Sequence, residues 1–151
     1  MSEKKRRVLS TMLICLCIAT VAFIWGNSML GSKASSNVSN SVLGALDPII
    51  RRFGIVSKDD LWLRKLAHFT EFAALGAELL FLAAVRRRLG LQAASNCAFA
   101  ALLAALTDET IQLINGRNSQ VLDVLLDFSG ALTGILIAWL ICRLIKKRRA
   151  L

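Results

Sequence analysis

Acidic residues are scarce in this 151-residue chain: ten Asp and Glu stand against nineteen Lys and Arg, so the formal net charge is +9. A strongly basic balance is typical of nucleic-acid-binding proteins. Here, though, the basic residues cluster at the ends of apolar runs, and not along one motif helix or among aromatic stacking residues. We therefore expect no nucleic acid partner. The sequence also lacks the patterns of a nucleophile elbow, a phosphate-binding loop and a zinc-binding helix.

Cysteine is present at only four positions, Cys15, Cys17, Cys97 and Cys142, and each of these lies inside an apolar run. Cys15 and Cys17 form a C-x-C pair, but a metal site would need further ligands nearby, and none follows. We interpret the four as small residues inside membrane helices and predict no structural disulfide.

Long apolar runs dominate the rest of the chain, which is 56% hydrophobic. A soluble domain seldom combines this content with so many basic residues, whereas a small membrane protein does so easily. Four segments approach the roughly 20 residues that a membrane span needs. The sequence therefore predicts a single domain over residues 1–151: an all-α, integral membrane four-helix bundle with helices at about 8–26, 61–85, 92–115 and 119–145. The first segment has no clear small-x-small cleavage site after it, so we expect it to be retained.

The one long connection, residues 27–60, begins polar and rich in serine. Apolar residues then recur at i, i+3, i+4 spacing between Val42 and Phe53, which indicates a short amphipathic helix lying in the membrane interface. Pro48 limits the regularity of this segment, so an irregular loop packed on the bundle is the alternative.

The distribution of basic residues predicts the orientation. Twelve of the nineteen lie in the head, in the connection after the second helix, or in the tail: Lys4, Lys5, Arg6, Arg7, Arg86, Arg87, Arg88, Arg143, Lys146, Lys147, Arg148 and Arg149. Short cytoplasmic segments carry an excess of Lys and Arg. We therefore expect both termini to be cytoplasmic, with the long first connection and the turn after the third helix on the opposite side.

Small residues at helical spacing predict where the helices pack closely. One stripe on the first helix consists of Cys15, Ala19, Ala22 and Gly26. On the fourth helix, Gly130 and Gly134 form a G-x-x-x-G motif. This motif is compatible either with packing inside the monomer or with a homodimer.

Polar side chains extend the same packing faces toward the predicted outer ends of three helices. At 100° per residue, each helix places its polar residues on one side, and a rise of about 1.5 Å per residue puts them within roughly 15 Å of those ends. The predicted ligand-binding residues are Arg64, Lys65, His68 and Glu71 on the second helix, Asp108, Glu109 and Gln112 on the third, Arg117 at the turn, and Asp123 and Asp127 on the fourth. Charged groups at membrane depth indicate a functional site. We predict a polar pocket open to the extracytoplasmic side.

Three interpretations of this pocket stay open. It can be a structural ion network. It can bind a polar or anionic head group, since Arg64, Lys65 and Arg117 suit phosphate or carboxylate. It can also be catalytic, because His68 beside Glu71 resembles an oriented general base; the catalytic candidates are His68, Glu71, Asp108 and Asp123. We expect no cofactor, although a divalent cation held by Glu71, Asp108, Asp123 or Asp127 is compatible with these oxygen ligands.

Several motifs resemble the VanZ-like family. They are WGNSM at residues 25–29, RKLAHFTEF at 64–72, TDETIQ at 107–112, Gly116-Arg117, and DVLLDFSG at 123–130. The resemblance covers the chain from the first predicted helix to the fourth. It implies a small multi-pass bacterial membrane protein. The family is named for a protein linked to low-level resistance to the glycopeptide antibiotic teicoplanin. The family pattern carries over to Lys65, His68, Glu71, Asp108, Glu109, Gln112, Arg117, Asp123 and Asp127. Phe72 stands where another aromatic residue is common.

From the residues and the resemblance together, we expect a protein of the bacterial cytoplasmic (inner) membrane that contacts membrane lipids. The pocket would bind an amphipathic envelope ligand, either a lipid-linked precursor or a lipoglycopeptide such as teicoplanin, with a role in glycopeptide resistance or cell-envelope homeostasis. One alternative is a membrane enzyme acting on a lipid-linked, phosphorylated or sugar head group through His68 and the carboxylates. The other is a structural or interaction subunit of an envelope complex.

Overall fold

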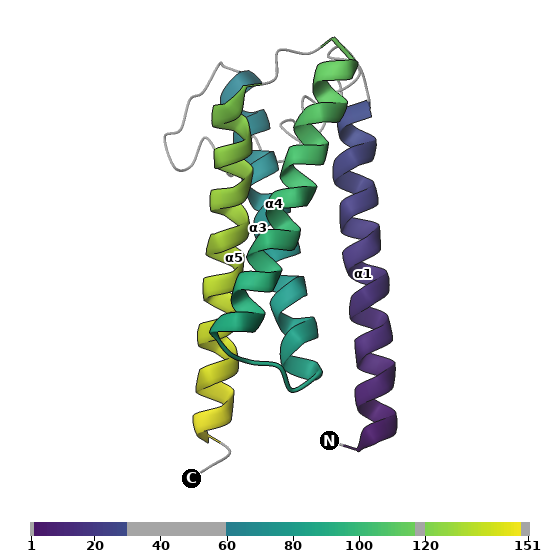
Figure 1. Ribbon diagram of the computed structural model, residues 1–151, viewed down its shortest axis with the longest axis vertical. Coiled ribbons are helices and arrows are strands. Elements are labelled where there is room, and N and C mark those ends of the chain that lie inside the picture. Colours follow the sequence, from purple (N-terminus) through teal and green to yellow (C-terminus); the bar gives the residue numbers. More distant parts are fainter. Residues whose placement is uncertain (1, 30–59, 117–119, 149–151) are drawn as a thin grey trace, which may run out of the picture.

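The computed structural model describes residues 2–29, 60–116 and 120–148, with side chains in the second range described from residue 64 onward. This part of the chain forms four helices: α1 (Glu3–Met29), α3 (Asp60–Val85), α4 (Leu91–Ile114) and α5 (Val121–Arg148). They run side by side along the long axis, and the start of α1 and the end of α5 lie at the same end (Figure 1). All four are long and apolar enough to cross a membrane. For the described residues, the prediction of an all-α fold with four helices long and apolar enough to span a membrane is confirmed.

The helix bounds differ from the predicted ones mainly in α1, which begins in the charged head and continues to Met29. Arg7 and Glu3 form an i, i+4 ion pair of 2.7 Å that supports its first turns, so the helix does not need apolar residues to begin there. Gly116, just beyond α4, has a φ of +70°, the left-handed conformation that glycine adopts readily after a helix end. The predicted interfacial helix at 42–53 lies outside the described residues.

The closest helix contact joins α3 and α5, which pack together more extensively than any other pair. Backbone meets backbone here: a Cβ atom added at Gly134 would overlap the carbonyl oxygen of Ala73, and one at Gly76 would overlap that of Ala131. Gly130 meets the α3 backbone in the same way. The G-x-x-x-G motif therefore packs helices within one chain, since only glycine allows this approach. A homodimer through the same residues stays a prediction.

Helix α1 joins the bundle through polar contacts as well as apolar ones. The Thr20 hydroxyl is hydrogen-bonded to the Glu78 carboxylate of α3 at 3.0 Å. The indole N–H of Trp25 donates to the backbone carbonyl of Ala104 in α4 at 3.3 Å. These contacts settle the rotation of α1 about its axis, because they place Thr20 and Trp25 on its inner side.

The predicted packing stripe on α1 is wrong as a contact face. Cys15, Ala19, Ala22 and Gly26 are all exposed in the described structure, and no described atom would come within 4 Å of a Cβ at Gly26. α1 instead buries Cys17, Ile24 and Ser28. The physical reason is that polar partners on α3 and α4 settle the rotation of α1, whereas small residues alone only permit close packing.

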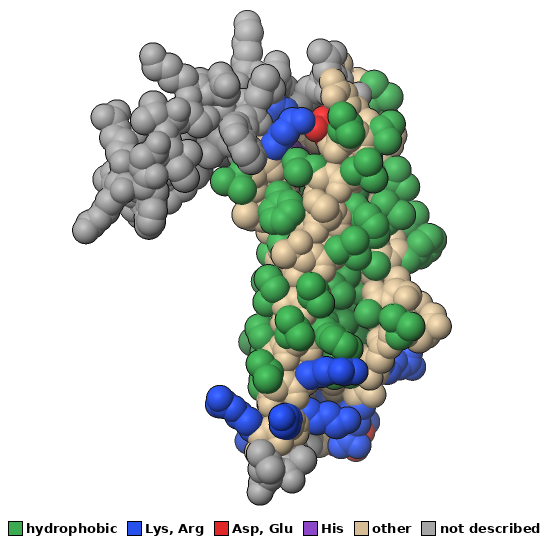
Figure 2. All heavy atoms as spheres, turned by 90° about the vertical axis from the view of Figure 1, so that its left-hand side faces the viewer, with side chains coloured by type: hydrophobic (Ala, Val, Ile, Leu, Met, Phe, Trp, Pro, Cys, Tyr) green, Lys and Arg blue, Asp and Glu red, His purple; other side chains and the backbone are tan. Residues whose placement is uncertain are grey.

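The surface divides into an apolar band and a basic end. Figure 2 shows hydrophobic side chains along the middle of the molecule and Lys and Arg gathered at the end where α5 finishes. At this end the guanidinium of Arg143 lies 3.8 Å from the ring centre of Trp139, a cation–π contact suited to a membrane interface. The basic head, the α3–α4 connection and the tail thus share one end of the bundle.

Replacing Gly134 with alanine tests the α3–α5 contact. The added methyl group meets a backbone oxygen that cannot rotate away, so we expect a loss of about 1–3 kcal/mol in the free energy of unfolding. The matched control is Gly26→Ala, whose methyl group enters open space and gains helix propensity. Denaturant titration of both variants in detergent micelles measures the difference. Equal stability of the two variants would contradict the described packing.

Candidate functional site

Polar residues of three helices meet near the end of the bundle opposite the basic end. α3 and α5 begin at this end and α4 finishes there, so residues early in α3 and α5 lie level with residues late in α4 (Figure 1). We call the following set the polar cluster: Lys65, His68, Glu71, Asp108, Glu109, Gln112, Asp123 and Asp127. It contains five of the ten acidic residues of the chain.

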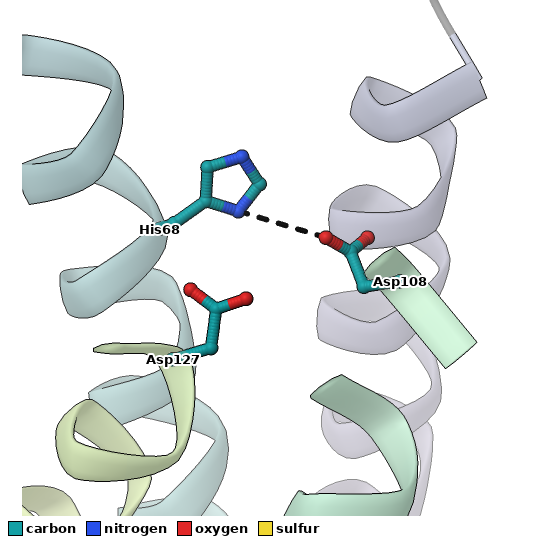
Figure 3. A group of neighbouring side chains, drawn as sticks. All are labelled: His68, Asp108 and Asp127. Atoms are coloured by element: carbon teal, nitrogen blue, oxygen red, sulfur yellow. Dashed lines mark ion pairs between the residues drawn. The ribbon is translucent and has the colours of Figure 1, made fainter. Parts of the chain in front are cut away.

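The centre of the cluster consists of His68, Asp108 and Asp127, one residue from each of α3, α4 and α5 (Figure 3). The His68 Nδ1 atom lies 3.7 Å from Asp108 Oδ2. One nitrogen or oxygen atom from each of the three side chains lies within 4.8 Å of the other two. Asp108 is 0% exposed and Asp127 is 1% exposed, so both carboxyl groups are removed from solvent.

Hydrogen bonds and ion pairs compensate part of this burial. The Gln112 amide donates to Asp108 Oδ2 at 2.8 Å and to Glu109 Oε1 at 3.2 Å. This amide therefore links the two acids of α4 on the inner face of the helix. Such neutral hydrogen bonds lower the cost of burying carboxylates but do not neutralise them.

Lys65 and His68 contact the acids within the described part of the chain, and His68 is positively charged only when it is protonated. The Lys65 ammonium lies 3.0 Å from Asp123 Oδ1, at the more exposed rim of the cluster. His68 Nδ1 lies 3.9 Å from Glu71 Oε2 in addition to its contact with Asp108. The cluster therefore carries more acidic groups than positively charged ones, an arrangement that is costly at membrane depth.

Two oxygens at the centre have no hydrogen-bond partner among the described residues: Asp108 Oδ1 and Asp127 Oδ2. Both belong to carboxyl groups that are almost fully buried. An unpartnered buried carboxylate oxygen costs free energy unless a proton, a cation or a ligand donor reaches it. The centre is therefore chemically incomplete as the protein alone forms it.

Helix α1 supplies partners that the sequence interpretation missed. The Asn27 side chain hydrogen-bonds to Glu71. Ser28 is completely buried, although its hydroxyl has no hydrogen-bond partner among the described residues. The available signal was the WGNSM motif, which contains both residues. This motif contributes to the family resemblance, but hydropathy alone does not say which face of an apolar helix turns inward.

The two predicted arginines have different outcomes. Arg64 is half-buried, and its Nε has no hydrogen-bond partner in the described structure. No hydrogen bond from this atom therefore links Arg64 to the acids of the described residues. Arg117 lies outside the described residues, so its place in the site stays a prediction.

The family model described as VanZ/LLP1 matches residues 9–143 of the chain. The chain belongs to the VanZ/LLP1 family. No curated protein matches its sequence, and no solved structure matches its fold. The matched region extends over the four membrane-spanning helices.

Membership of the VanZ/LLP1 family agrees with the resemblance predicted from the motifs, and the structure shows how those motifs meet. The H-F-x-E motif of α3 presents His68, and the D-E-x-x-Q motif of α4 presents Asp108 and Gln112 beside it. The D-x-x-x-D motif of α5 contributes Asp127. The motifs that characterise this chain thus converge on one buried layer, although they are far apart in sequence.

Replacing Gln112 with leucine tests the hydrogen bonding of the α4 acids. Asp108 and Glu109 would lose the amide that they share, so we expect the free energy of unfolding to fall by about 1–3 kcal/mol. Gln92→Leu is the matched control, since Gln92 also bonds along α4 but is exposed. Denaturant titration in micelles compares the two, and an equal effect would show that the buried amide has no special role.

Proposed function

We propose that this VanZ/LLP1-family protein is a multi-pass protein of the bacterial cytoplasmic membrane that binds an amphipathic envelope ligand. The ligand is a lipid-linked envelope precursor or a lipoglycopeptide such as teicoplanin. One observation carries the proposal: separate helices bring buried, incompletely hydrogen-bonded carboxyl groups together at the end of the bundle opposite the basic end. By the positive-inside rule, that end faces outward.

The chemistry of the cluster suits the head group of such a ligand. Carboxylates accept hydrogen bonds from sugar hydroxyls and amines, which peptidoglycan precursors and glycopeptides carry in number. Lys65, whose side chain is 48% exposed, lies at the rim and can donate to a phosphate or carboxylate. An acyl or polyprenyl chain would then lie along the apolar band of the bundle (Figure 2). A role in glycopeptide resistance or envelope homeostasis follows from binding such a ligand at the outer face.

A second candidate function is catalysis on the same head group. The observation in its favour is that His68 lies within 4 Å of both the Glu71 and Asp108 carboxylates. A histidine oriented by carboxylates is a suitable general base. The third alternative, a structural or interaction subunit, needs only that the cluster stabilises the fold.

The proposed orientation is tested by cysteine labelling in a cysteine-free background. Gln120→Cys, next to the start of α5, should react with a membrane-impermeant maleimide in intact cells, because that end is expected outside. Arg88→Cys at the basic end is the control and should react only after the cells are opened. The reverse labelling pattern would overturn the topology and place the polar cluster toward the cytoplasm.

Ligand binding is tested by native mass spectrometry of the protein purified in a mild detergent. We expect a copurified lipid-linked molecule, and Asp108→Asn should reduce its occupancy several-fold while membrane levels stay near those of the wild type. Glu78→Gln is the matched control, because Glu78 is a partly buried acid of α3 that pairs with Thr20 of α1.

The same experiment separates the three functions. Turnover of the copurified molecule that disappears in His68→Ala would favour the enzyme. Cluster variants that reduce membrane levels without changing the occupancy of the remaining protein would favour the structural subunit and contradict the proposed binding site.

A further inference from the structure

The centre of the polar cluster has the composition and spacing of a metal site. His68, Asp108 and Asp127 offer one imidazole nitrogen and two carboxylate oxygens, from three different helices, within 4.8 Å of one another. A tetrahedral metal ion with bonds of about 2.0–2.2 Å holds its ligand atoms about 3.3–3.6 Å apart. Side-chain rotation that brings the three groups about 1 Å closer would therefore place them at bonding distance. Figure 3 shows the three side chains directed into the same space.

The hydrogen bonding of the two aspartates leaves ligand atoms available. Gln112 donates to Asp108 Oδ2, whereas Asp108 Oδ1 has no hydrogen-bond partner among the described residues. The same is true of Asp127 Oδ2, and both side chains are at least 99% buried. Gln112 thus orients Asp108 in the way that outer partners orient metal ligands. Unpartnered oxygens in such deeply buried carboxyl groups indicate that a cation belongs between them.

We propose that His68, Asp108 and Asp127 bind one divalent transition-metal cation of the Mn²⁺ or Zn²⁺ type. The imidazole nitrogen favours these ions over Mg²⁺ and Ca²⁺, which prefer oxygen ligands alone. Three protein ligands leave coordination positions for water or for a head-group oxygen, as in open metal sites.

A bound dication also balances the charge of the layer. Within the described residues, Lys65 pairs with Asp123, and His68 contacts Glu71 and Asp108. As a metal ligand the imidazole of His68 is neutral, so it does not offset the charge of these acids. Two further positive charges between Asp108 and Asp127 lower the electrostatic cost of bringing these acids together in a low-dielectric environment.

Metal binding at this site does not require the proposed envelope ligand, although the head group of that ligand could also bind to the metal. The test therefore uses Mn²⁺ alone, with full-length protein stripped by a chelator and held in detergent without added lipid. Electron paramagnetic resonance measures the free Mn²⁺ signal during titration. We expect saturable uptake of one ion per chain in the wild type, with Zn²⁺ as a competitor.

Three variants make this test specific. Asp127→Asn and His68→Gln remove a ligand each and should weaken Mn²⁺ binding at least about tenfold. Glu78→Gln removes a carboxylate of α3 outside the centre and should bind as the wild type does. A variant that fails to fold is left out of the comparison. The proposal can still be tested on the wild type alone, because bound Mn²⁺ should raise its Tm.

The outcomes are distinct from those of the head-group experiment. Absence of saturable uptake in the wild type, or equal weakening in Glu78→Gln, would overturn the metal site. Such a result would leave ligand copurification untouched, since that measurement does not require the ion. Loss of copurification with normal Mn²⁺ uptake would instead remove the proposed ligand and keep the metal site.

Discussion

The backbone contact between α3 and α5 is the constraint on which the other features depend. Gly130 brings α5 against the carbonyl group of Phe69, the neighbour of His68, and Gly134 repeats the contact one turn further along. Asp127 lies one turn before Gly130, so the same contact determines how far this carboxylate is from His68. Gly130 is thus needed for the polar cluster as much as for packing, because a wider separation of α3 and α5 would move His68 and Asp127 out of contact distance.

The remaining helices complete a layer that α3 and α5 begin. α4 adds Asp108 and its partner Gln112, and α1 adds Asn27 to Glu71. Below the layer, alanines and larger apolar residues fill the interior, including Phe72, Leu75, Ala101, Ala105 and Ala131. The bundle therefore combines an apolar part, which can pack by shape alone, with a polar part in which every group needs a partner.

Much of this arrangement could be predicted from the sequence. Long apolar runs predict helices, and the alternating spacing of small and polar residues predicts which face of α4 turns inward, as the burial of Ala101, Ala105 and Asp108 confirms. The left-handed Gly116 followed from its position after a helix. The grouping of the acids at one level followed from the rise per residue of each helix.

The rotation of α1 could not be predicted in this way. After Thr11, α1 contains few polar residues, namely Thr20, Asn27 and Ser28, and its small residues are more numerous there. The partners on α3 and α4 decide which side turns inward. The pairing of Lys65 with Asp123 was likewise undetermined, because several cations and acids had comparable depths and wheel positions.

The order of the helices along the chain has a consequence for membrane insertion. α3 and α4 have mean hydropathies of 1.4 and 1.5, against 2.4 for α1 and 2.0 for α5. A carboxylate near the middle of an inserting helix costs about 3 kcal/mol. Each of the two less apolar helices therefore benefits from a neighbour that is already in place. When α3 inserts after α1, Thr20 and Asn27 can already hydrogen-bond to its acids. When α4 inserts after α3, His68 can already contact Asp108. During synthesis, Asp108 would meet an imidazole before α5 brings a second carboxylate beside it.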